Sequence, residues 1–240
     1  MLIWAAEADV SDMERLQESI GAALHNARRL LEDADYLRFA EPPATAYYLA
    51  LIAQEECAKA FLLALARRRI VPWDQHILRA TRDHACKQLT CVVMEYVTPE
   101  LDEFLERCDA IHIHDLPALP RRVADAMNIL RHEKIGRWVS RSWFWAEEPE
   151  YDSGALRIAE GRHDARKQDA LYVRLSSDAS LASVPSVAVL ELDAEIERAA
   201  RFAGLVDRLL EDEAYPGLDW DMIEAALRAL FTDPIAAEAG

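Results

Sequence analysis

Charged side chains inside an otherwise apolar stretch are the first place to look for chemistry in this sequence. Between residues 44 and 66 the charged side chains are Glu55, Glu56 and Lys59. A helix that is apolar almost all round is normally buried, so Glu55 and Lys59, which share a helix face, are expected to point into the protein. Burying such charges is costly unless they are paired, which predicts a partner from another helix. The alternative is an exposed Glu–Lys pair one helical turn apart.

A second group lies between residues 79 and 87, where Arg79, His84 and Lys87 occur close together. His84 and Lys87 are one helical turn apart and should share a helix face. An imidazole whose protonation is set by a neighbouring ammonium and by a carboxylate such as Glu55 can act as a general acid or base. The alternative is a histidine that is hydrogen-bonded in a polar corner of the core.

Lysine is scarce in this chain. Of the 27 basic residues, only Lys59, Lys87, Lys134 and Lys167 are lysines, and the rest are arginines. Where a generic positive charge is enough, the sequence uses arginine, so the lysines can mark places that need a compact ammonium group instead of a planar guanidinium. Chance retention explains the same count equally well.

The elements that must position these residues are helices. Apolar residues at steps of three and four predict a long amphipathic helix over residues 10–40. Pro42 and Pro43 break the chain before a second helix that runs to about residue 69, and the two helices should form an antiparallel hairpin. Similar patterns predict further helices over residues 75–97, 100–108, 118–146, 189–213 and 219–231.

Between about residues 149 and 188 the helical periodicity fails, because Gly and Ser become frequent. Residues 170–175 form the one run there that is typical of an extended strand. We therefore expect one all-α protein that is built as a helical bundle. Its parts are a helical bundle core over residues 1–148, an irregular segment over residues 149–188 within the same domain, and C-terminal helices over residues 189–240 that pack on the bundle.

Length and composition limit the classes of function. The chain has 240 residues, 52% of them hydrophobic and 29% charged, which fits a single packed domain. Its net charge of −16 argues against general attraction to nucleic acid or anionic membranes, so a polyanionic partner must be held locally. Four cysteines without a Cys-x-x-Cys pair, and no apolar run long enough to cross a bilayer, predict a cytoplasmic protein without membrane contact.

The most basic stretch of this acidic chain lies next to the extended run. It contains Arg162, Arg166, Lys167 and Arg174 together with Tyr172. A local basic patch with an aromatic ring can bind phosphate and stack a base, so Arg166, Lys167 and Tyr172 are candidates for RNA binding. The alternative is that these residues clasp the acidic C-terminal helices onto the bundle.

Several of these pieces, taken in order along the chain, resemble one known family. They are Asp33, the stretch from Ala44 to Lys59, the pair His84 and Lys87, and the stretch from Arg166 to Val173. Over roughly residues 20–175 this succession resembles the AbiV-type abortive infection proteins of bacteria. The resemblance implies an all-helical domain of the HEPN type and a role in defence against phage, with RNA or translation as the target.

HEPN-type ribonucleases resemble one another in an Arg-x4-6-His motif, in which the arginine would hold the scissile phosphate and the histidine would move a proton. Arg79 and His84 fit this motif within the resembling block and are the predicted catalytic pair. In one unbroken helix they would point about 140° apart, so a helix must begin or kink between them. The network that orients them would consist of Glu55, Glu56, Lys59 and Lys87. The same spacing also occurs at Arg69 with His76, Arg107 with His112 or His114, and Arg157 with His163.

Two functions are consistent with the sequence. The first is an anti-phage effector that cleaves RNA with no metal ion or other cofactor, associates as a homodimer and responds to a phage-encoded activator protein. The second is a non-catalytic helical module that captures a phage or ribosomal protein. The resemblance favours the first function, whereas the acidic composition favours the second, because a nuclease should not repel its substrate.

Overall fold

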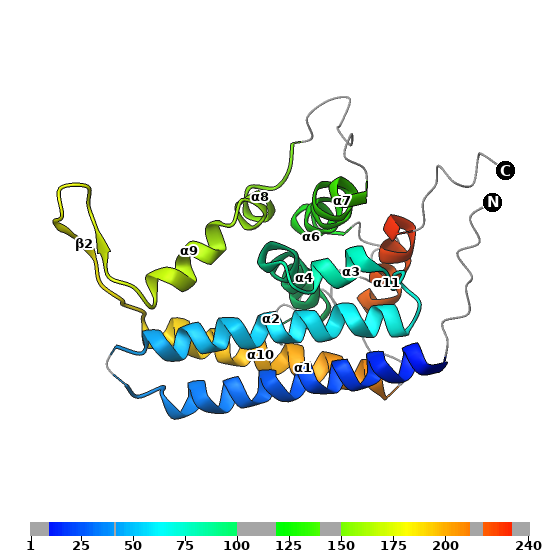
Figure 1. Ribbon diagram of the computed structural model, residues 1–240, viewed down its shortest axis with the longest axis horizontal. Helices are drawn as coiled ribbons and strands as arrows, with labels where there is room; N and C mark the ends of the chain where they lie inside the picture. Colours follow the sequence, from blue (N-terminus) through cyan, green and yellow to red (C-terminus); the bar gives the residue numbers. More distant parts are fainter. Residues whose placement is uncertain (1–9, 41, 100–118, 140–149, 212–217, 232–240) are drawn as a thin grey trace.

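The computed structural model describes residues 10–40, 42–99, 119–139, 150–211 and 218–231. Within these ranges the protein is a bundle of helices with one small antiparallel sheet of two strands, so the predicted all-α class is confirmed (Figure 1). Within the same ranges, none of the helices combines the length and the apolar character that crossing a membrane requires.

Three long helices form the base of the bundle. The helices α1 (Val10–Tyr36) and α2 (Ala44–Arg67) form the predicted antiparallel hairpin, and α10 (Val189–Leu210) packs against both of them (Figure 1). The apolar stripe of α1, which includes Leu16, Ile20 and Leu24, is buried against its neighbours. Because α2 is covered by α1 and α10 on one side and by α4 on the other, it is apolar almost all round.

The stretch predicted as one helix over residues 75–97 is two helices, α3 (Gln75–Ala80) and α4 (His84–Val97). The break has a local cause, since the carboxylate of Asp83 accepts a hydrogen bond from the backbone N–H of Cys86 and caps a new helix. Asp74 caps α3 in the same way. The prediction of a continuous helix was therefore wrong, and a helix does begin between Arg79 and His84.

The predicted helix over residues 118–146 is described as far as residue 139. It comprises α6 (Arg121–Asn128), the π-helix η1 (Ile129–Gly136) and the short α7 (Arg137–Val139). The helix α11 (Leu218–Phe231) packs on α4 and α6, and the ring of its Trp220 meets Phe61 of α2 edge to face. The predicted helix that ends near residue 108 lies outside the described residues.

The segment predicted as irregular is more regular than expected. It contains the helices α8 (Ser153–Ala159) and α9 (Arg162–Asp169), then a hairpin of strands β1 (Arg174–Leu175) and β2 (Leu181–Ser183). Its helices have only about two turns each, which is too short for the spacing of apolar residues to reveal them. The strand occupies only the end of the predicted extended run. The helix α8 packs on α4 and α6, and α9 contacts α4. Figure 1 shows the hairpin projecting from the molecule beyond α9.

Candidate functional site

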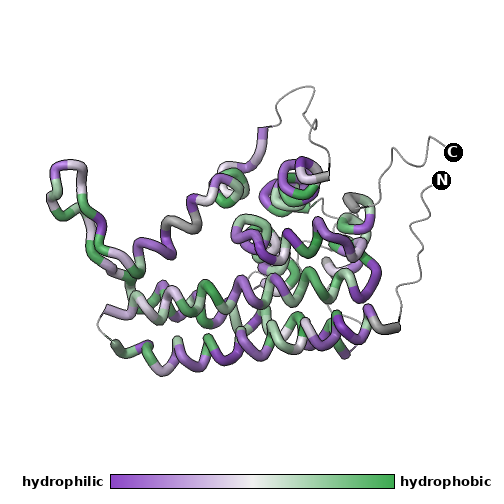
Figure 2. The backbone as a smooth tube through the Cα atoms, viewed as in Figure 1, coloured by the Kyte–Doolittle hydropathy of each residue, from purple (hydrophilic) through white to green (hydrophobic). Residues whose placement is uncertain are grey.

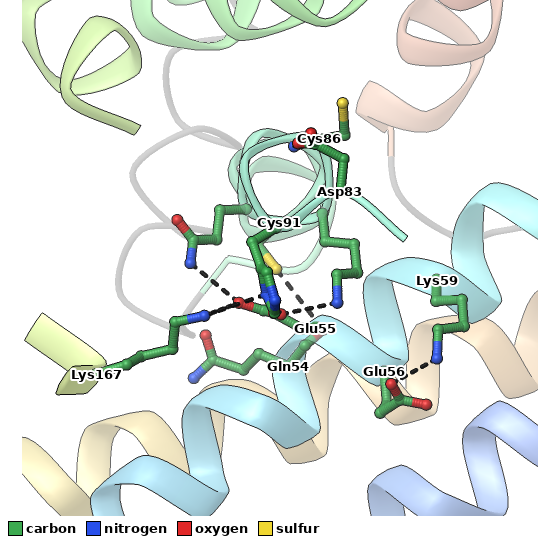
Figure 3. Close-up of polar contacts among 11 residues, drawn as sticks. Gln54, Glu55, Glu56, Lys59, Asp83, Cys86, Cys91 and Lys167 are labelled. Atoms are coloured by element: carbon green, nitrogen blue, oxygen red, sulfur yellow. Dashed lines mark hydrogen bonds and ion pairs between the residues drawn. The ribbon is translucent and has the colours of Figure 1, made fainter. Parts of the chain in front are cut away.

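A buried carboxylate on α2 is the centre of the candidate site. The side chain of Glu55 is only 3% exposed, and four side chains contact its two oxygens. Oε2 lies 2.6 Å from Nδ1 of His84 and 2.8 Å from Nζ of Lys87. Oε1 lies 2.5 Å from Nζ of Lys167 and 3.0 Å from Nε2 of Gln88. We call these five residues the Glu55 cluster (Figure 3).

Three helices bring the Glu55 cluster together. His84, Lys87 and Gln88 are three and four residues apart on α4, so they lie on one helix face, which meets α2 at Glu55. His84 is the first residue of α4, directly after the capping Asp83. Lys167 comes from α9, 112 residues further along the chain than Glu55. Figure 3 shows Lys167 reaching Glu55 from a separate helix.

The two ammonium groups keep Glu55 ionised. Burial by itself would raise the pKa of Glu55, but the positive charges and hydrogen bonds of Lys87 and Lys167 outweigh that effect and lower the pKa from 4.5 to about 2. Glu55 is therefore a carboxylate at any pH near neutral. A buried charge on α2 requires a partner of opposite charge from another helix, and Lys87 of α4 and Lys167 of α9 are such partners.

An ionised Glu55 fixes the tautomer of His84. The contact of 2.6 Å between Oε2 and Nδ1 is favourable only if Nδ1 carries the proton and donates it in a hydrogen bond. Nζ of Lys167 also lies 3.3 Å from Nδ1, but a protonated Nδ1 has no lone pair to accept, so both groups donate to Glu55 instead. In the neutral imidazole the lone pair then belongs to Nε2.

His84 is the exposed member of the Glu55 cluster. Its side chain is 56% exposed, compared with 8% for Lys87 and 4% for Lys167. No hydrogen bond of Nε2 is present within the described part of the chain. The arrangement is therefore a rigid, buried ion cluster that orients one accessible imidazole, as a carboxylate does for the histidine of a hydrolase triad.

A cleft of about 260 Å³ borders the Glu55 cluster, with Glu55, Gln88 and Lys167 in its wall. Two arginines in the cleft are paired, since Arg166 contacts Glu191 at 2.8 Å and Arg198 contacts both Glu95 and Glu195. Arg122 of α6 also faces the cleft and has no ion pair within the described residues.

The part of the chain that the structure describes contains no group of three or more His, Cys, Asp and Glu side chains that could hold a metal ion.

Two residues of the predicted network lie elsewhere. Lys59 pairs with Glu56 at 2.6 Å on α2, and neither residue contacts Glu55 among the interactions of the described residues. Figure 3 shows this pair on a different side of the helix from Glu55. The expectation that Glu55 and Lys59 would point inward together is therefore not met for Lys59, whose side chain is 30% exposed and pairs with Glu56 three residues before it.

The predicted catalytic arginine is not in contact with the histidine. The guanidinium of Arg79 lies over the indole ring of Trp138, 4.3 Å from the ring centre, whereas the His84 imidazole is directed to Glu55. The backbone N–H of Asp83, the residue before His84, donates a hydrogen bond to the carbonyl oxygen of Arg79. Among the alternative pairs, Arg107, His112, His114 and the side chain of His163 lie outside the described residues.

The three residues predicted to bind RNA have three different environments. Lys167 is buried in the Glu55 cluster, so it does not lie on a surface patch. Arg166 pairs with Glu191 of α10, as expected if the basic residues hold the C-terminal helices on the bundle. Tyr172 is 62% exposed beyond the end of α9. Gln88 was missed by the sequence analysis, although its position four residues after His84 places it on the same helix face.

The pKa of Glu55 leads to a prediction for acid stability. Because the folded value is lower than the ordinary value, the cluster contributes fully above about pH 4.5, by about 3 kcal/mol, and loses that contribution as the pH falls toward about 2. We expect the free energy of unfolding to fall more steeply over this range in the wild type than in Glu55→Gln. Thermal unfolding of both proteins at closely spaced pH values measures the difference, and parallel curves would contradict it.

A family model described as AbiV, of the HEPN type, matches residues 15–204, a range that contains the whole Glu55 cluster. No curated protein and no solved structure matches the chain. The match confirms the resemblance seen in the sequence, and it covers well over half of the chain. The chain therefore belongs to the AbiV family of HEPN-type abortive infection proteins.

Proposed function

We propose that this AbiV-family protein is an anti-phage effector that cleaves RNA, with His84 as the catalytic base. The observation that carries the proposal is the hydrogen bond of 2.6 Å between Nδ1 of His84 and the ionised Glu55. It supports a proton on Nδ1, which leaves Nε2 as the atom that accepts a proton when the imidazole is neutral, and the ring is accessible to a large substrate.

The reaction that suits one oriented imidazole is attack by the ribose 2′-hydroxyl on the adjacent phosphate. Nε2 of His84 takes the proton from the 2′-oxygen as that oxygen bonds to phosphorus. The bond from phosphorus to the 5′-oxygen of the next nucleotide breaks, and that oxygen takes a proton from solvent water, while the His84 imidazolium afterwards returns its proton to the resulting hydroxide. The products are a 2′,3′-cyclic phosphate and a 5′-hydroxyl. Glu55 stabilises the imidazolium that forms.

Phosphate binding in this proposal is assigned to arginines. Arg79 remains the candidate for the scissile phosphate, because its guanidinium lies over Trp138 and has no ion pair with a carboxylate in the part of the chain that the structure describes. Arg122 and Arg166 in the cleft beside Glu55 are candidates for a neighbouring phosphate. An acidic chain can hold RNA in this way only locally, so we expect binding to weaken strongly as salt increases.

The test is digestion of total cellular RNA by the purified protein in the presence of EDTA, with and without an extract of phage-infected cells as a source of an activator. We expect fragments that end in a 2′,3′-cyclic phosphate. A folded protein that gives no fragments under either condition would contradict RNA cleavage. A stoichiometric protein partner recovered from infected cells without RNA turnover would instead support the non-catalytic binding module.

A further inference from the structure

The cleft beside the Glu55 cluster has a polar lining that the attack on phosphorus does not use. Its volume of about 260 Å³ is slightly below the roughly 300 to 1,000 Å³ of sites for drug-sized molecules, so it can hold one base or one nucleotide. Glu55, Gln88 and Lys167 belong both to the wall of the cleft and to the Glu55 cluster. A ligand in the cleft therefore lies next to the residues that orient His84.

Apolar side chains form part of the cleft wall. They are Leu51 of α2, Val92 of α4 and Ile158 of α8. Val92 is 6% exposed and Ile158 is 2% exposed, so packing holds both of them in place. Apolar side chains of this kind cover the faces of a flat aromatic ring, and the edges of that ring then need partners for hydrogen bonds. The cleft therefore suits a nucleobase better than a sugar, whose faces carry hydroxyl groups.

The least exposed polar atoms of the cleft that lack a partner are acceptors of hydrogen bonds. The amide nitrogen of Gln54 donates to the backbone oxygen of Glu195 at 3.0 Å and to its Oε2 at 2.7 Å. The amide oxygen of Gln54 then has no partner in the described part of the chain, although the residue is only 6% exposed. Nε2 of Gln88 donates to Glu55, which leaves its amide oxygen in the same condition. Such acceptors favour a ligand that carries N–H groups.

Glu95 is a carboxylate of the cleft that a ligand can reach. Its side chain is 34% exposed, and its Oε1 accepts a hydrogen bond of 2.9 Å from Nε of Arg198. Burial alone would lower the pKa of Arg198, but Glu195 and Glu95 outweigh that effect and raise it, so the guanidinium stays charged. The arginine uses one of the about four lone pairs of the Glu95 carboxylate, and both oxygens can still accept another N–H.

Positive charge lies at the exposed side of the cleft. Arg122 and Arg166 are exposed residues in its lining, and Arg166 belongs to α9, which Figure 2 shows as mostly hydrophilic where it is coloured. Arg122 also lines a neighbouring cavity of about 220 Å³ together with Ser153 and Arg157. Neither Arg122 nor Arg157 has an ion pair among the residues that the structure describes. These guanidinium groups can hold the phosphates of a nucleotide whose base lies in the cleft.

We propose that the cleft binds the base of a guanosine in RNA, an assignment that rests on the proposed function for the identity of the ligand. Guanine carries its N1–H and its 2-amino group side by side, and these two donors match the two oxygens of Glu95. Adenine and cytosine place an unprotonated ring nitrogen beside their amino group, and that nitrogen would face a carboxylate oxygen. Uracil has a single N–H between two carbonyl oxygens, so it makes at most one of the two hydrogen bonds.

Binding of short labelled RNAs tests the base preference without any cleavage. The RNAs differ only in their central base, and the central sugar is 2′-deoxyribose, so the attacking hydroxyl is absent. Fluorescence anisotropy should show that guanine binds at least about 10-fold more tightly than adenine, cytosine or uracil, with inosine, which lacks the 2-amino group, in between. All these RNAs carry the same charge, so the difference reports the base and not the phosphates.

Glu95→Gln should remove most of the guanine preference, a loss of about 10-fold or more, because an amide N–H would then face an N–H of the base. Arg198 keeps Glu195 as a partner, so thermal unfolding should stay close to the wild type. The matched control is Glu224→Gln on α11. Glu224 also pairs with one arginine and is 26% exposed, but it does not line the cleft, so this variant should bind the RNAs like the wild type.

Equal affinity for all the RNAs, or no binding by the folded wild type, would overturn the proposal. A guanine preference that survives Glu95→Gln would also overturn it, because the base would then be bound elsewhere. Free guanosine 5′-monophosphate that binds more tightly than the guanine RNA would make a free nucleotide the ligand instead. RNA cleavage can fail separately: a protein that prefers guanine but yields no fragments with a cyclic phosphate keeps the guanine site and loses the proposed function.

Discussion

Glu55→Gln is expected to lower the free energy of unfolding by about 3 to 5 kcal/mol at neutral pH. The substitution keeps the size of the side chain but removes the negative charge that Lys87 and Lys167 share. Both lysines are buried, so their ammonium groups would be left without that charge in a place that water cannot reach well. Chemical denaturation of the two proteins, followed by circular dichroism, measures the change.

Glu56→Gln is the matched control, because it makes the same change one residue further along α2. Within the described residues Glu56 has one ion-pair partner, Lys59, whose side chain is 30% exposed, so the loss should be less than about 1 kcal/mol. Equal losses at positions 55 and 56 would mean that the Glu55 cluster has no special role in stability. A large loss at Glu55 alone is the expected result.

His84→Ala is expected to reduce RNA cleavage by about 10² to 10⁴-fold, the usual range for removal of a general base. Stability should change by no more than about 1 kcal/mol, because the side chain is largely exposed and Glu55 keeps its other partners. Initial rates on a short labelled RNA measure the first effect, and denaturant unfolding measures the second. Loss of activity in an unfolded variant would instead indicate a structural role.

His76→Ala is the matched control for catalysis. His76 lies near the start of α3 and, with Arg69, provides another match to the Arg-x4-6-His spacing. Its ring is close to Gln75, and no contact with a carboxylate orients it within the described residues. Activity should therefore be close to wild type. If His76→Ala were inactive and His84→Ala active, the catalytic histidine would have been assigned to the wrong helix.

The sequence predicted correctly the features that repeat over a long helix or that follow from a single buried charge. The stripe of apolar residues on α1 and the apolar character of α2 predicted the long hairpin, and the buried charge at Glu55 predicted a partner from another helix. Two of the four lysines, Lys87 and Lys167, contact Glu55, whereas the hypothesis that these positions require an ammonium group stays a prediction. These inferences rest on helical spacing and on the cost of burying charge.

The sequence did not reveal the short helices, nor the contacts between residues that are far apart along the chain. The break before α4 rests on one capping carboxylate, that of Asp83, and the helices α8 and α9 have too few turns to show a period. Lys167 looked like part of a surface patch, because its neighbours are basic and polar. Only the packing of α9 against the bundle directs this one side chain to Glu55.

The long separation between Glu55 and Lys167 has a consequence for the synthesis of the protein. The ribosome adds Lys167 112 residues after Glu55, which corresponds to about 6 to 20 s at ordinary rates of elongation. During that interval the nascent α2 carries a carboxylate that lacks one of its two ammonium partners. The cluster that orients His84 is therefore completed late, when about two thirds of the chain has been made. The complete Glu55 cluster therefore cannot form in the cell until the ribosome has synthesised α9.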